Sequence, residues 1–121
     1  MSKHLLVVDD EDLILELYSD FFEQKGFNVE TADTVDKALD KLGDSAAAHD
    51  LIISDVKLPY KTGFDLYDEI QTNNLNIPII FMTGFDYKTD IAKKLDDLGA
   101  IWFSKPVKLE ELLEQINEIL E

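Results

Sequence analysis

Acidic, hydroxyl and amine side chains follow closely on short apolar runs at several points of the sequence. Five of them occupy such positions: Asp9, Asp10, Asp55, Thr83 and Lys105. If the apolar runs are parallel strands of one sheet, their carboxyl ends share an edge, and ligands bind at that edge in sheets of this kind. Three carboxylates, one hydroxyl and one amine would therefore meet at one place. This convergence is the strongest functional signal in the chain.

The expected carboxylate cluster requires a cation. Three carboxylates within a few ångströms cannot all remain ionised without compensation, and the candidates are the amine of Lys105 and a divalent metal. A ligand set of oxygens alone suits Mg²⁺, which accepts a few carboxylates and keeps several waters. Phosphoryl transfer needs mainly positioning and charge neutralisation, and carboxylates can act as covalent acceptors that form aspartyl phosphates. The cluster thus indicates phosphoryl transfer, in which Thr83 and Lys105 hold phosphoryl oxygens.

Each of these residues also has a purely structural explanation. Asp9 or Asp10 could cap the amino end of the helix that follows, and Asp55 could open a turn. Thr83 could stabilise a loop, and Lys105 could be a solvated surface amine. The coincidence of all these roles at one sheet edge favours the chemical interpretation, but the alternatives stay open at this point.

Composition limits the class of protein. The 121 residues include 26 acidic and 11 basic side chains, and the formal charge is −15. This length predicts one domain over residues 1–121, and the charge argues against binding to nucleic acid or anionic membranes. The chain has no cysteine, which is compatible with a reducing cytoplasm. The four apolar residues near the start are too few for a signal peptide or a membrane span.

Apolar runs and helical patterns alternate five times along the chain. The expected strands are 5–8, 27–31, 51–53, 77–82 and 100–103, and the expected helices are 11–25, 34–42, 64–73, 87–98 and 107–120. Gly26 and Gly99 occupy positions expected of helix C-caps, and Gly43 to Ala48 resembles a loop. Such alternation predicts an α/β fold, with helices on both faces of a parallel sheet.

The first helix carries more apolar surface than one buried face needs. Its apolar side chains, which include Leu13, Ile14 and Leu17, spread over about 200° of the helix, whereas those of the last helix cover about 120°. Neighbouring helices could cover the excess, or one edge of the first helix could be a docking surface for another protein. The pattern alone leaves both open.

The motifs of the chain, taken in order, resemble the receiver domain of bacterial two-component response regulators. The matching segments are Leu5 to Glu11, Leu51 to Asp55, Leu58-Pro59 with Gly63, Phe81 to Gly84, Gly99-Ala100 and Lys105-Pro106. The resemblance covers the whole length and implies a doubly wound, flavodoxin-like (βα)5 fold with strand order 2-1-3-4-5.

The resemblance also implies a role for each site residue. Asp55 corresponds to the acceptor of a phosphoryl group from phosphohistidine. Mg²⁺ would be bound by Asp10 and Asp55 directly, by Asp9 through water and by the backbone carbonyl of Lys57. Thr83 and Lys105 would contact the phosphoryl oxygens. The Lys105–Pro106 peptide bond is expected to be cis, which would direct the amine into the site.

Signal output and partner contacts follow from the same resemblance. Thr83 is expected to move toward the phosphoryl group and let the aromatic side chain at position 102 turn inward. Trp102 stands there, where tyrosine or phenylalanine is more usual, and its structural alternative is packing against the fourth helix. Leu13, Ile14 and Leu17 are expected to contact the phosphodonor. The face formed by the last two helices and the last strand is expected to bind the output target.

The sequence thus predicts a stand-alone cytoplasmic receiver of bacterial signal transduction, acting in a phosphorelay or as a diffusible regulator. It would be a monomer or a weak phosphorylation-dependent dimer, and its only catalysis would be its own phosphorylation and dephosphorylation. The first alternative is a receiver segment cut from a hybrid kinase. A small Mg²⁺-dependent phosphohydrolase, a flavodoxin-like mononucleotide binder and a receiver-like interaction module without phosphotransfer agree less well with the sequence.

Overall fold

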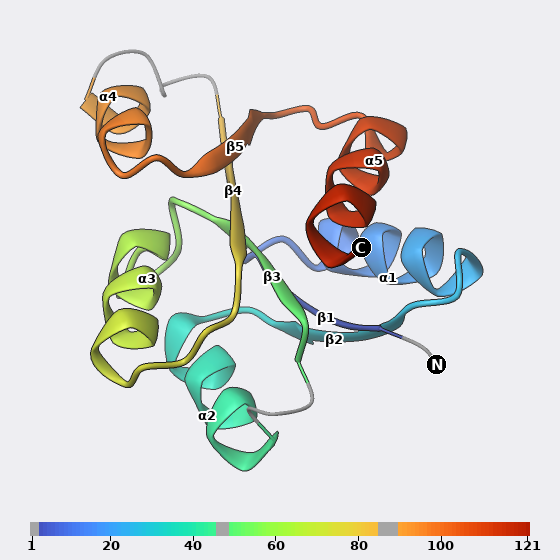
Figure 1. Cartoon of the computed structure of the whole chain (residues 1–121), viewed down its shortest axis with the longest axis horizontal. Helices are drawn as coiled ribbons and strands as arrows, with labels where there is room; N and C mark the ends of the chain where they lie inside the picture. The colour runs from blue at the N-terminus through green and yellow to red at the C-terminus, as the bar shows by residue number, and fades with distance from the viewer. Residues whose placement is uncertain (1–2, 46–48, 85–89) are drawn as a thin grey trace.

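Five parallel strands form one sheet in the computed structural model of the chain, which describes residues 3–45, 49–84 and 90–121 (Figure 1). The strands are β1 (His4–Val8), β2 (Asn28–Ala32), β3 (Leu51–Asp55), β4 (Ile79–Thr83) and β5 (Ile101–Ser104). Their order across the sheet is β2-β1-β3-β4-β5, as predicted. The chain passes from β1 to β2 on one side and then crosses to β3 on the other side of β1. Doubly wound sheets bind ligands at the carboxyl ends of the strands where the order switches in this way, here between β1 and β3.

Helices cover both faces of the sheet (Figure 1). They are α1 (Asp12–Gln24), α2 (Val35–Ser45), α3 (Gly63–Thr72), α4 (Asp90–Asp97) and α5 (Leu109–Leu120). Side chains of β1 alternate between the faces: Leu5 and Val7 pack in the cluster that holds α1 and α5, whereas Leu6 and Val8 pack in the cluster that holds α2 and α3. Successive side chains of a strand point to opposite faces of the sheet. A strand that is apolar throughout therefore fits a sheet that helices bury on both faces.

Two glycines end helices as the sequence predicts. Gly26 has φ +95° and Gly99 has φ +68°, a region that costs other residues free energy. After α1, the N–H of Gly26 donates to the carbonyl of Glu23, and the N–H of Phe27 donates to that of Phe22. These paired bonds form a Schellman motif, which leads the chain straight into the next strand.

Several boundaries differ from the prediction. Helix α2 continues to Ser45 instead of ending before Gly43, because one glycine inside a helix costs only about 1 kcal/mol. Strand β4 begins at Ile79, since Pro78 has no N–H and joins the ladder only by accepting from the N–H of Ile52 at 2.9 Å. Helix α4 begins at Asp90, and positions 87–89 of the expected helix lie outside the described residues.

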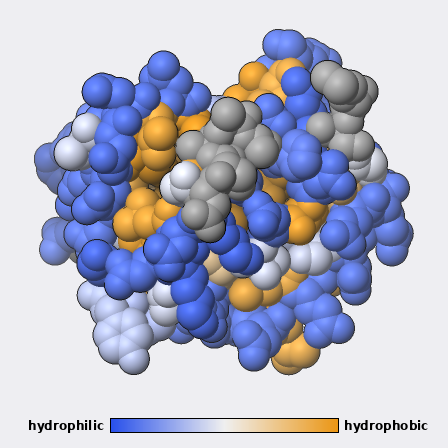
Figure 2. All heavy atoms as spheres, turned by 90° about the horizontal axis from the view of Figure 1, so that it is seen from below, coloured by the Kyte–Doolittle hydropathy of each residue, from blue (hydrophilic) through white to orange (hydrophobic). Residues whose placement is uncertain are grey.

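The face shown in Figure 2 is mainly hydrophilic, with smaller apolar patches between the polar side chains. This agrees with the excess of acidic residues in the sequence. Among the helices that the structure describes, none combines the length and apolar character that crossing a membrane requires.

Candidate functional site

The carboxyl edge of the sheet brings the predicted site residues together. Asp55 and Thr83 are the last residues of β3 and β4, and Asp9 and Lys105 directly follow β1 and β5. The register aligns these strand ends, because Val8 lies opposite Ser54, Asp55 opposite Met82, and Thr83 opposite Ser104. The convergence expected from the sequence is therefore present in the fold.

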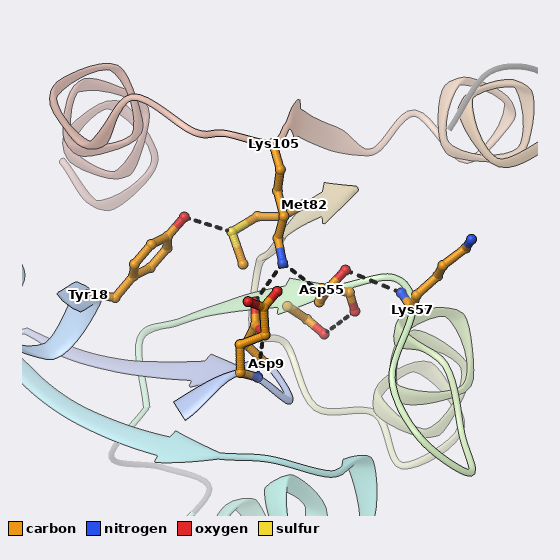
Figure 3. A network of polar contacts seen from close by, with 8 residues as sticks. Asp9, Tyr18, Asp55, Lys57, Met82 and Lys105 are labelled. Atoms are coloured by element: carbon orange, nitrogen blue, oxygen red, sulfur yellow. Dashed lines mark hydrogen bonds and ion pairs between the residues drawn. The ribbon is translucent and has the colours of Figure 1, made fainter. Parts of the chain in front are cut away.

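Lys105 joins two of the carboxylates. Its Nζ lies 2.7 Å from Oδ2 of Asp55 and 2.9 Å from Oδ2 of Asp9, and its side chain is only 20% exposed (Figure 3). The Lys105–Pro106 bond is cis, as predicted. Burial alone would lower the pKa of Lys105, but the hydrogen bonds to Asp55 and Asp9 outweigh it and raise this pKa. The amine is therefore a charged member of the site, and the solvated surface lysine is the wrong interpretation.

Asp9 is fully buried and does not cap α1. The N-cap residue is Glu11, whose side chain makes no capping hydrogen bond. Oδ1 of Asp9 accepts the N–H of Glu11 at 2.9 Å, which leaves Oδ2 for Lys105. The capping alternative fails for Asp9 because this residue directly follows β1 and lies too far ahead of the helix, which starts at Asp12.

Asp55 is held in a tight segment between β3 and α3. Its Oδ1 accepts the backbone N–H of Lys57 at 3.2 Å, and its carbonyl accepts the hydroxyl of Ser54 at 2.9 Å. The amine of Lys57 points away from the carboxylates (Figure 3). Burial raises the pKa of the Asp55 carboxyl, and the hydrogen bond from Lys105 offsets only part of that effect. A buried carboxylate with a raised pKa is typical of functional sites.

Gly63 makes this segment possible. Its N–H donates to the carbonyl of Val56 at 2.8 Å. A Cβ atom on Gly63 would lie 2.5 Å from the backbone oxygen of Asp55 and 3.1 Å from Cα of Val56. Only a residue without a side chain fits this close approach of the amino end of α3 to the end of β3.

The three acids fit a metal ion. Asp9, Asp10 and Asp55 each place one carboxylate oxygen within 4.8 Å of the others, and Asp10 is exposed where the other two are buried. Oxygen ligands at a partly open position match the preference of Mg²⁺. The ligand role expected of the Lys57 carbonyl stays a prediction.

Thr83 has an unsatisfied hydroxyl. The residue is buried, and its Oγ1 has no hydrogen-bond partner within the described part of the chain. A buried polar group of this kind costs free energy unless something else satisfies it. Because Thr83 ends the strand next to β3, an oxygen-rich ligand on Asp55 is a suitable acceptor.

Tyr18 of α1 is a neighbour of the site that the sequence does not reveal. In the sequence it is one more position of the apolar arc, whereas its phenol is buried and donates to Sδ of Met82 at 3.2 Å (Figure 3). Burial raises the pKa of Tyr18 to about 12, and the charge of Lys105 opposes this only in part. Tyr18 therefore presents a neutral hydroxyl beside the carboxylates.

We expect a tyrosine titration near pH 12 that the Tyr18→Phe variant lacks. The folded chain stabilises the neutral phenol, so this contribution to stability is complete below pH 10 and is lost as the pH rises through about 12. Ultraviolet absorbance, with circular dichroism to verify folding at each pH, measures it. The control Tyr60→Phe, at an exposed tyrosine, should keep the high-pH step. A high-pH step that survives in Tyr18→Phe would contradict the prediction.

Trp102 lies beside α4. It is half-buried and packs against the cluster of Val56, Phe81 and Leu95. Its indole Nε1–H donates to Oδ1 of Asp96 in α4 at 3.0 Å. Packing against the fourth helix, one of the two sequence interpretations, is thus observed, and the inward turn of the side chain stays a prediction.

The expected docking residues divide by exposure. Leu13 and Leu17 are 79% and 52% exposed, whereas Ile14 is partly buried and packs against the core. Ile14 and Leu17 line an apolar groove of about 460 Å³ that also reaches Tyr18 and Lys105. Neighbouring helices therefore do not cover the outer edge of the arc, and the groove connects it with the site.

The sequence is similar to known proteins over almost its whole length. The sequence model of the response regulator receiver domain matches residues 5–117. The response regulator SaeR of Staphylococcus aureus is 32% identical over 118 residues, which cover 97% of this chain and 50% of that protein. The chain thus spans about half the length of the curated relatives it matches.

Solved structures agree with the sequence match. A response regulator receiver domain protein from Clostridium thermocellum has a TM-score of 0.89 at 29% identity, covering 98% of this chain and 94% of that one. A CheY-like response regulator receiver domain protein from Methanospirillum hungatei JF-1 has a TM-score of 0.88 at 30% identity, covering 99% and 94%. The likeness in fold includes all the strands that carry the site.

Proposed function

Because the chain belongs to the response regulator receiver domain family, we propose that Asp55 accepts a phosphoryl group from a phosphohistidine of a sensor kinase or phosphotransfer protein. Accepting a phosphoryl group is the general function of this family. The observation that carries the proposal is the contact of Lys105 with both Asp55 and Asp9, next to the unsatisfied hydroxyl of Thr83.

The residues of the site account for the transfer. A carboxylate oxygen of Asp55 forms the new O–P bond while the N–P bond of the phosphohistidine breaks. The imidazole leaves with the electron pair of that bond and takes a proton from water. Lys105 neutralises charge on the phosphoryl oxygens, and Thr83 donates its O–H to one of them. A protein promotes phosphoryl transfer mainly by positioning the reacting groups and by stabilising their charge.

Asp9, Asp10 and Asp55 would hold Mg²⁺ in this proposal, together with the carbonyl of Lys57. When bound, the ion would neutralise charge on the carboxylates and the incoming phosphoryl group. The close approach of three carboxylate oxygens supports this assignment. Lys105 alone supplies one positive charge for three negative ones, so a divalent cation completes the balance.

Labelling with a small phosphodonor tests the function. Incubation with acetyl phosphate and Mg²⁺ should add one phosphoryl group to the intact mass of the chain, and chelation of the metal should prevent the addition. No gain of mass, under conditions that label a control receiver, would overturn the proposal. Steady release of phosphate from phosphomonoesters would instead favour a phosphohydrolase.

We further propose that residues 1–121 form one receiver domain that works in the cytoplasm, either within a phosphorelay or as a regulator. The face of α4, β5 and α5 would bind the downstream target, in a monomer or a weak dimer that phosphorylation favours. The half-length match to SaeR also agrees with a receiver segment of a larger protein. A hybrid kinase is one such protein.

Truncation of the outer edge of α1 should slow transfer from a donor protein. We expect Leu13→Ala with Leu17→Ala to reduce the rate about tenfold, because exposed apolar anchors of an interface contribute roughly 1–2 kcal/mol. The measurement is the rate of transfer from a phosphorylated kinase or phosphotransfer protein that labels the wild-type chain. Labelling by acetyl phosphate should not change. The control is Leu98→Ala, an exposed leucine outside α1. An equal fall of both rates would contradict this docking surface.

A further inference from the structure

The indole of Trp102 is tied to α4 by a hydrogen bond. Its Nε1–H donates to Oδ1 of Asp96 at 3.0 Å, in the exposed part of the face between α4 and β5. The ring itself is half-buried and packs against the cluster of Val56, Phe81 and Leu95. A large change in the χ1 angle of Trp102 moves Nε1 away from Asp96, so this hydrogen bond stabilises the observed rotamer.

The end of α4 fixes the position of Asp96. The N–H of Gly99 donates to the carbonyl of Asp96, and the N–H of Ala100 donates to that of Leu95, both at 3.0 Å. With Gly99 at φ +68°, these bonds form a second Schellman motif, which joins α4 to β5 with little freedom. The contact between Asp96 and Trp102 is therefore built into the connection between helix and strand.

A buried cluster links this contact with the phosphoacceptor. Val56, which directly follows Asp55, packs together with Phe81 of β4 and Leu95 of α4. Trp102 packs against the same cluster, and Phe81 lies two residues before Thr83. Because protein interiors are close-packed, a displacement of the strand end at Thr83 must be accommodated by these side chains.

We propose that Asp96 is a positioning residue whose hydrogen bond to Trp102 stabilises the unphosphorylated conformation and breaks when the phosphoryl group is bound. The proposal rests on the proposed function of Asp55 and adds a residue that regulates it. A bond that is made in only one of two conformations shifts the equilibrium between them toward that conformation. By linkage, removing this bond strengthens the binding of a phosphoryl group or its analogue.

The experiment compares Asp96→Ala with Asp97→Ala. Asp97 is the adjacent acid on α4 and pairs with Lys93 at 3.4 Å, so its loss controls for charge and helix position. Beryllium trifluoride with Mg²⁺ serves as the phosphoryl analogue, and its affinity is measured by titration. We expect Asp96→Ala to bind it about threefold to tenfold more tightly than the wild type, as the loss of one such hydrogen bond allows. Asp97→Ala should match the wild type.

Fluorescence gives an independent readout, because Trp102 is the only tryptophan in the sequence. In the absence of the analogue, Asp96→Ala should change the emission and reduce quenching by acrylamide, because a larger share of the molecules then has the indole turned inward. Asp96→Asn keeps an acceptor oxygen and should restore both toward wild-type values. In the wild-type chain, addition of the analogue should change the emission in the same direction as Asp96→Ala does.

The outcomes separate this inference from the proposed function. Equal affinities of Asp96→Ala and the wild type would overturn the inference, as would equal shifts in the two alanine variants. If the wild-type chain binds no analogue, the proposed function fails. In that case an unchanged emission of Asp96→Ala would also refute the restraint on Trp102, whereas a changed emission would support that restraint.

Discussion

Replacement of Asp55 by Asn is expected to abolish incorporation of a phosphoryl group from acetyl phosphate. An amide cannot form the acyl phosphate that a carboxylate forms, and the variant also loses one of the three negatively charged carboxylates grouped for a metal. Intact mass after incubation with donor and Mg²⁺ measures the result, with one added phosphoryl group in the wild type and none in Asp55→Asn.

The control for this prediction is Asp68→Asn, at an exposed acid of α3, which should still be labelled. Folding of Asp55→Asn should be intact, because burial raises the pKa of Asp55 and an ionised carboxylate there costs stability. The variant should thus be at least as stable as the wild type at neutral pH. The difference in unfolding free energy between Asp55→Asn and the wild type should narrow as the pH falls through the raised pKa of Asp55, since protonation of Asp55 then removes the same charge from the wild type. Full labelling of Asp55→Asn would place the acceptor elsewhere.

Substitution of Gly63 by Ala is expected to be strongly destabilising. The added methyl group would lie 2.5 Å from the backbone oxygen of Asp55, so that either α3 or the end of β3 must shift. Overpacking of this kind costs about 1–3 kcal/mol, and we expect thermal unfolding to occur roughly 5–15 °C lower. Labelling of Asp55 should fall as well, because the displaced atoms belong to the proposed acceptor itself.

Gly43→Ala is the matched control for this substitution. Gly43 lies within α2, and a Cβ atom added to it would meet nothing within 4 Å. Alanine should therefore stabilise the helix by about 0.5–1 kcal/mol and leave labelling unchanged. The steric explanation would be wrong if Gly63→Ala unfolded at the wild-type temperature and accepted phosphoryl groups at the wild-type rate.

Much of the fold and the grouping of the site could be predicted because they depend on local patterns joined to one topological rule. Short apolar runs identify the strands, and Gly26 and Gly99 identify two helix ends. The rule that parallel sheets bind ligands at their carboxyl ends then groups Asp9, Asp55 and Lys105 without any knowledge of side-chain contacts.

The remaining features depend on contacts that no sequence pattern encodes. Tyr18 resembles any apolar residue of the first helix until the thioether of Met82 is found beside its hydroxyl. The indole of Trp102 requires a partner, but Asp96 is only one of several nearby acids. Capping by Asp9 or Asp10 stayed open as an alternative because the exact start of a helix is poorly determined by sequence, and the structure has Glu11 at the N-cap.

The ion pair of Lys105 with Asp9 limits how early the site can form during synthesis of the chain. These residues are 96 positions apart, so the pair cannot exist until the chain has been made past Lys105. Synthesis delivers the acids of β1 and β3 first, and they remain mutually repulsive in any partly made chain. Contacts between such distant residues form late and slowly. A chain that has not been made past Lys105 therefore has the acids of the site without the amine that binds two of them.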